Sequence, residues 1–100
     1  MANDQQSLDA DLGEKIKLGQ ETAEYLWHVP DDAETREKLK VLIEEIKELS
    51  AKKGRTEMPR LCDELLEALQ SEPTQQQVDL MHDGFSRLHK LWGAAKTGLL

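Results

Sequence analysis

The sequence has very little cysteine and no recognisable export signal. Cys62 is the single cysteine among 100 residues, which excludes an internal disulfide and a cysteine-rich zinc site. Chains without disulfides are typical of reducing compartments. The N-terminal stretch from Met1 to Gln6 has neither the basic region nor the apolar stretch of a secretory signal. We therefore expect a cytoplasmic protein whose residues 1–100 form one domain.

Long apolar runs and clustered positive charge are also missing. No apolar run approaches the ~20 residues that a membrane-spanning helix needs. The net charge is −7, because residues 1–35 hold nine acidic and two basic side chains, whereas residues 36–100 hold eleven of each. Nucleic acids and anionic membrane surfaces attract clustered lysine and arginine. The sequence therefore predicts neither a nucleic-acid partner nor a membrane partner.

The sequence is rich in helical periodicity. Apolar residues recur three and four positions apart in four segments, and no segment alternates with the period of two that is typical of a strand. The expected helices cover Leu8–His28, Asp32–Lys53, Glu57–Ser71 and the chain from Thr74 onward. Because the connections are short, consecutive helices should be antiparallel. We predict an all-α protein, an up-down-up-down four-helix bundle, with residues 1–6 disordered.

Polar residues mark where these helices begin. Each helix follows a residue that can accept hydrogen bonds from free backbone amides: Ser7, Asp31 or Asp32, Thr56 and Thr74. Thr74 and Gln77 have the spacing of a capping box. Gly13 and Gly19 weaken the first helix by roughly 1 kcal/mol each relative to alanine.

The apolar stripes identify the candidate core. In the last helix, residues three and four apart form a heptad seam: Val78, Met81, Phe85, Leu88, Trp92, Ala95 and Leu99. Cys62 lies inside the apolar stripe of the third helix, so we expect it in the core. Trp27 and Trp92 should also fill the core, although an exposed tryptophan can instead anchor a partner.

The last helix also carries the candidate functional residues. Four of them share a face because they are spaced four, three and four apart: His82, Ser86, His89 and Gly93. Gly93 removes a side chain one turn after His89, and Arg87 and Lys90 supply positive charge nearby. A neutral imidazole is a nucleophile, and basic side chains stabilise a phosphoryl group. These are the parts that a phosphoryl-accepting histidine needs.

The same stretch resembles a known signature. It reads Phe85-Ser86-Arg87-Leu88-His89-Lys90-Leu91-Trp92-Gly93-Ala94-Ala95. It is similar to the histidine-phosphotransfer (HPt) signature, which has a large apolar residue four positions before the histidine and continues as His-x-Leu-Lys-Gly-x-Ala. Trp92 stands where that signature has lysine. Residues 65–81 also resemble the phosphotransfer domain of chemotaxis-type histidine kinases.

The resemblance implies a four-helix bundle that exchanges phosphoryl groups with a histidine kinase and with a response-regulator receiver domain. It implies that His89 is the phosphoacceptor and that Gly93 gives clearance for a partner. The partner-binding residues we expect lie around the histidine: His82, Ser86, Arg87, Lys90 and Gly93. Because the receiver brings its own Mg²⁺ site, we expect no cofactor and no metal in this chain. We expect a phosphocarrier of a two-component phosphorelay rather than a free-standing enzyme.

Two other interpretations stay open. The heptad seam also suits a non-catalytic helical interaction module of a larger signalling protein, and an exposed Phe85 and Trp92 would give a homodimer surface. A degenerate phosphotransfer fold would bind receivers without accepting phosphate. His82 and His89 also resemble a pair of zinc ligands, but no third ligand is apparent.

Overall fold

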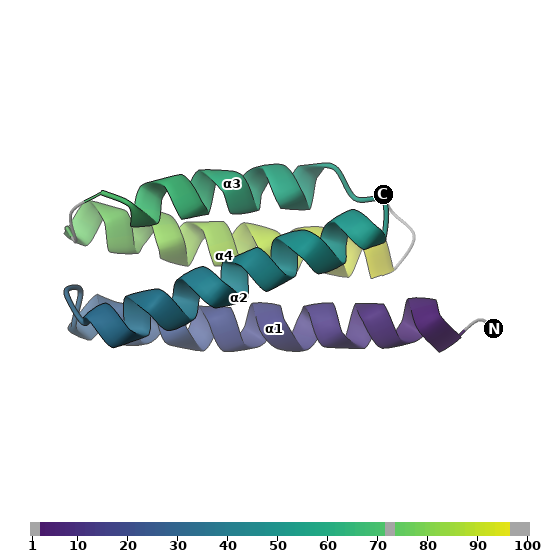
Figure 1. Ribbon diagram of the computed structural model, residues 1–100, viewed down its shortest axis with the longest axis horizontal. Helices are drawn as coiled ribbons and strands as arrows, with labels where there is room; N and C mark the ends of the chain where they lie inside the picture. Colours follow the sequence, from purple (N-terminus) through teal and green to yellow (C-terminus); the bar gives the residue numbers. More distant parts are fainter. Residues whose placement is uncertain (1–2, 72–73, 97–100) are drawn as a thin grey trace.

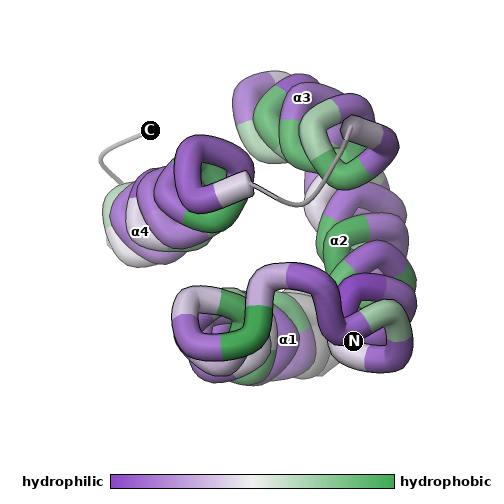
Figure 2. The backbone as a smooth tube through the Cα atoms, turned by 90° about the vertical axis from the view of Figure 1, so that its left-hand side faces the viewer, coloured by the Kyte–Doolittle hydropathy of each residue, from purple (hydrophilic) through white to green (hydrophobic). Residues whose placement is uncertain are grey.

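Four α-helices run alternately up and down in the computed structural model, which describes residues 3–71 and 74–96, with side chains from Ala10 to Ala94. The helices are α1 (Asn3–His28), α2 (Ala33–Lys52), α3 (Glu57–Leu69) and α4 (Gln75–Lys96). In sequence order each helix packs against the next, and α4 packs back against α1 (Figure 1). Seen end-on, the helices stand at the corners of a square (Figure 2). The predicted up-down-up-down bundle is confirmed.

The first helix begins earlier than the sequence predicted. It starts at Asn3 rather than Leu8, so Ser7 lies inside the helix and is not its N-cap. The backbone of residues 3–6, which we expected to be disordered, is helical. No proline or glycine interrupts the chain before Gly13, and a nucleated helix gains one hydrogen bond for each residue that joins it.

The caps of α2 and α3 differ from each other. Asp32 caps α2: its Oδ1 accepts from the amides of Glu34 and Thr35 at 3.2 and 3.4 Å. The Thr35 hydroxyl donates to its Oδ2 at 3.0 Å, and this bond is the main reason that the pKa of the Asp32 carboxyl lies below its ordinary value. Thr56 occupies the N-cap position of α3 but makes no side-chain capping bond.

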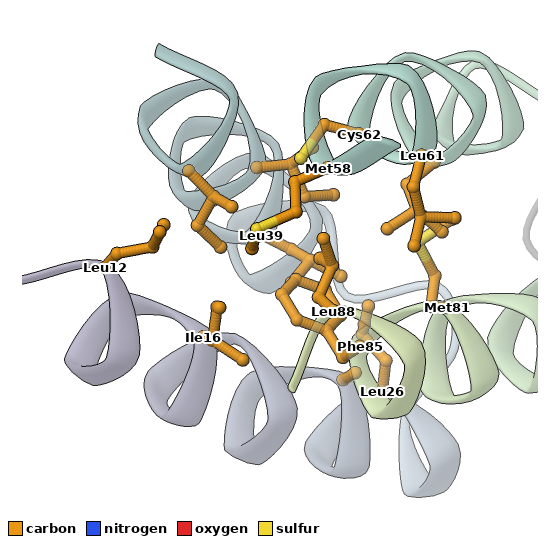
Figure 3. Close-up of a cluster of buried hydrophobic side chains, with 14 of the residues drawn as sticks. Leu12, Ile16, Leu26, Leu39, Met58, Leu61, Cys62, Met81, Phe85 and Leu88 are labelled. Atoms are coloured by element: carbon orange, nitrogen blue, oxygen red, sulfur yellow. The ribbon is translucent and has the colours of Figure 1, made fainter. Parts of the chain in front are cut away.

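The apolar stripes of all four helices meet in one core (Figure 3). The seam residues whose side chains are described face inward, and Phe85 and Leu88 are fully buried. Ala95 and Leu99 lie outside the described side chains. Cys62 is buried as predicted, and its burial raises the pKa of the thiol to about 12, so the thiol stays protonated and inert.

Glycines on α1 let aromatic rings of α4 come close. A Cβ on Gly19 would lie 2.1 Å from Cε1 of Phe85, and a Cβ on Gly13 would lie 2.4 Å from Cζ2 of Trp92. Real Cβ atoms essentially never approach another atom this closely. These glycines therefore have a packing role in addition to the helix-weakening effect that the sequence indicated, because each leaves room for one aromatic side chain.

A polar connection joins α2 to the loop between α3 and α4. Nη2 of Arg36 donates to the carbonyl oxygens of Leu69 and Ser71 at 2.8 and 3.1 Å, and its Nη1 donates to Oε1 of Gln77. The buried Gln77 side chain also donates to the Ser71 carbonyl at 2.9 Å. The predicted capping box is thus only half formed. The Gln77 amide donates to the Thr74 hydroxyl at 3.2 Å, while the Gln77 side chain makes contacts across the bundle.

Removing this connection should weaken the bundle. We expect Arg36→Met to lower the free energy of unfolding by about 1.5 kcal/mol, since hydrogen bonds to charged groups contribute about 1.5–3 kcal/mol and this site is partly exposed. Urea denaturation followed by circular dichroism measures the change. Lys40→Met, at an exposed position one turn along α2, is the matched control and should stay within about 0.5 kcal/mol of wild type. An equal, small effect of both substitutions would contradict a stabilising role for Arg36.

Candidate functional site

The structure leaves the His89 imidazole exposed on α4. The preceding residue, Leu88, is fully buried, and this fixes the rotation of the helix so that His89 emerges at the edge of the core. A Cβ added to Gly93, one turn later, would meet nothing within 4 Å. Gly93 therefore leaves the helix surface open one turn after His89.

His89 rests against an aromatic ring of its own helix. The centroids of the His89 and Trp92 rings lie 5.9 Å apart, with an interplanar angle of 48°. Trp92 is partly buried and packs against the core, where its indole occupies the space left by Gly13 of α1. The histidine is thus backed by a ring that is itself held between two helices.

His82, two turns earlier, lies in different surroundings. Its ring meets the Trp27 ring of α1 edge-on, with centroids 6.1 Å apart. The two rings line an open groove of about 640 Å³. Its other lining residues are Glu24, His28, Asp79 and Asp83. Three carboxylates therefore share this groove with His82, and their charge disfavours a negatively charged phosphoryl group there. Trp27 is 47% exposed, so the prediction that it fills the core is wrong.

The structure separates some of the residues that the sequence grouped. Ser86 is half-buried and lies between the two histidines on their helix face. Lys90 is exposed directly after His89. Arg87, in contrast, lies in a groove between α4 and α3 that Glu57 and Glu64 also line. Lys90 is therefore the basic residue that we assign to the surface around His89, and Arg87 is assigned to the groove between α3 and α4.

Sequence reasoning missed a second surface between α1 and α2. Leu18 is 51% exposed and Val41 is 45% exposed, and both line a mainly apolar groove of about 760 Å³. Its rim is mixed in charge: Glu34, Glu37, Lys38 and Glu45. The sequence does contain an indication of this surface, because Leu18 and Val41 are large apolar residues outside the core stripes.

Two further observations concern ligands and membranes. Within residues 3–71 and 74–96, no group of three or more His, Cys, Asp or Glu side chains is placed to hold a metal ion. Over the same residues, no helix combines the length and the apolar character that crossing a bilayer requires.

Comparisons with protein-family models, with curated proteins and with solved structures find no match for this chain.

Proposed function

We propose that this chain is a histidine-phosphotransfer module in which His89 accepts a phosphoryl group from one signalling protein and passes it to another. The observation that carries the proposal is the exposed His89 ring beside the open space at Gly93. A phosphocarrier has no active site of its own, so its histidine must enter the active site of a partner. An imidazole that is exposed, and free of a side chain on one flank, meets this requirement.

The transfer step needs few groups from this chain. The lone pair of the outer ring nitrogen, Nε2, attacks phosphorus while the proton stays on Nδ1. The bond between phosphorus and the aspartyl oxygen of a phosphorylated receiver breaks, and the carboxylate leaves with the electron pair. The receiver supplies the Mg²⁺ that neutralises the charge of the moving group. Lys90, exposed next to His89, adds a positive charge from this side.

Labelling the intact chain tests the proposal. The protein is incubated with phosphoramidate, a small phosphodonor, and separately with a panel of phosphorylated receiver domains. We expect intact mass spectrometry to show one added phosphoryl group, stable in base and labile in acid as a phosphohistidine is, with a nitrogen–phosphorus resonance in the ³¹P spectrum. The absence of an acid-labile label with every donor would contradict the proposal.

Gly93→Ala should raise stability and impair transfer at the same time. Alanine is favoured over glycine in a helix by about 1 kcal/mol, and the new Cβ meets nothing within 4 Å, so the free energy of unfolding should rise. The same methyl group narrows the approach to His89, and we expect transfer from a receiver to slow about tenfold, a loss of ~1.4 kcal/mol. Labelling by the much smaller phosphoramidate should not change. Equal receiver rates for both proteins would show that clearance at Gly93 is irrelevant.

A second candidate function is a helical interaction module, and the groove between α1 and α2 favours it. Leu18 and Val41 expose apolar surface there, which is typical of contact sites. The homodimer surface suggested by the sequence needed an exposed Phe85, but Phe85 is fully buried in the core. The exposed Leu18 and Val41 instead favour a homodimer that uses the groove between α1 and α2. Sedimentation over a range of concentrations tests this: association that disappears in Leu18→Gln supports it, and a strict monomer counts against it.

A further inference from the structure

We propose that Trp92 is a positioning residue for His89, and that it holds the imidazole in the orientation that a partner meets. The inference rests on the proposed function, since it concerns how the same histidine is presented. Trp92 touches neither the phosphoryl group nor the attacking nitrogen in this scheme. It acts through the ring of His89.

The contact geometry supports this role. Residues three apart on a helix lie on neighbouring positions of its surface, so Trp92 is within reach of His89. The centroid distance of 5.9 Å and the 48° tilt lie in the range of favourable contacts between aromatic rings. An exposed histidine without such a neighbour rotates about two side-chain bonds. Contact with the indole restricts this rotation.

The indole is itself fixed in place. Its Cζ2 atom lies 2.4 Å from where a Cβ of residue 13 would stand, so only glycine at that position leaves room for it. Trp92 also packs against the buried core. His89, Trp92 and Gly13 thus form a chain of contacts from the exposed imidazole to the backbone of α1. The position of the imidazole therefore depends on how α1 and α4 pack together.

Pre-ordering a side chain removes part of the cost of binding. Immobilising one side chain with several rotamers at an interface changes an equilibrium constant by about two- to twelvefold. We expect an effect of this size on transfer when the indole is removed. His82 on the same helix also has an aromatic neighbour, but that neighbour is Trp27 of α1. A change at Trp27 therefore leaves the ring beside His89 in place.

Three variants separate positioning from general packing. In Trp92→Leu, we expect the ring-current shifts of the His89 ring protons to disappear from the ¹H spectrum and phosphoryl transfer from a receiver to slow about two- to twelvefold. Trp92→Phe keeps an aromatic ring and should retain most of both properties. Trp27→Leu changes the other tryptophan, which is not in contact with His89 but with His82, and should leave the His89 signals and the transfer rate unchanged. Urea denaturation shows that each variant is folded during the measurement.

The outcomes distinguish the two proposals. Wild-type protein that takes no label from any donor overturns the proposed function and, with it, the positioning role. Wild-type protein that is labelled, together with folded Trp92→Leu that transfers at the wild-type rate, overturns the positioning role alone. A Trp92→Phe variant that is as slow as Trp92→Leu would also overturn it, because the effect would then not depend on an aromatic ring beside the histidine.

Discussion

The His89→Gln variant is expected to take no phosphoryl group from phosphoramidate or from a receiver domain. Glutamine is similar in size to histidine, but its amide nitrogen is not a nucleophile, so the step that forms the nitrogen–phosphorus bond cannot occur. His89 is exposed, so the substitution should change the free energy of unfolding by less than about 0.5 kcal/mol. Intact mass spectrometry after incubation with each donor measures the loss, and urea denaturation shows that the fold is kept.

His82→Gln is the matched control, since it makes the same change two turns away on the same helix. The carboxylates of Glu24, Asp79 and Asp83 line the groove at His82, and they repel a phosphoryl donor. We therefore expect His82→Gln to be labelled like wild type. A label that survives in His89→Gln but is lost in His82→Gln would move the acceptor to His82. A receiver that binds wild type and His89→Gln equally well, without labelling either, would indicate the degenerate phosphotransfer fold.

Much of the fold was predictable because helix formation is governed by local patterns. Apolar residues at helical spacing identified four helices, and the short connections implied antiparallel neighbours. The structure selects Asp32 from the two predicted caps of α2 and confirms the burial of Cys62, and both predictions depend on residues close in the sequence. The start of α1 was wrong, because a plausible cap at Ser7 does not end a helix that the preceding residues can continue.

The contacts between distant segments were not predictable in the same way. Arg36 reads as one of many charges on a solvated helix, yet it binds a loop more than thirty residues away in the chain. Gly13 and Gly19 read as weak points of α1, and only the packing of two aromatic rings against them reveals their use. Both features depend on which faces of two helices meet, and the local spacing of residues along one helix does not show this.

Part of the candidate site was predictable from helical spacing. The spacing placed His82, Ser86, His89 and Gly93 on one face of the helix, which follows from the period of an α-helix alone. Their surroundings depend on the neighbouring helices. Trp27 of α1 lies beside His82, whereas the ring beside His89 is Trp92 of the same helix, which packs against Gly13 of α1. Arg87 lines a groove with residues of α3. The sequence analysis assigned Trp92 to the core seam and did not identify its contact with His89.

The second large effect is expected at Gly19, where alanine should destabilise the bundle. In an open helix position, this change would add about 1 kcal/mol of stability. At Gly19 the new Cβ would lie 2.1 Å from a fully buried ring of Phe85, which has no room to retreat. Overpacking of this kind costs about 3 kcal/mol. The net loss should be about 2 kcal/mol, which lowers the melting temperature by about 8–16 °C for a domain of this size.

A double-mutant cycle tests whether contact with Phe85 is the cause. Phe85→Leu itself destabilises the core, because it removes packed ring atoms. It also leaves space for a methyl group on residue 19. In that background Gly19→Ala should cost little, so the double variant should be more stable than the sum of the single effects by at least about 1 kcal/mol. Gly93→Ala, the same substitution in open space on α4, should stabilise the protein in either background. Strict additivity of Gly19→Ala and Phe85→Leu would instead mean that α1 and α4 can move apart, and that the close approach at Gly19 does not hold their spacing.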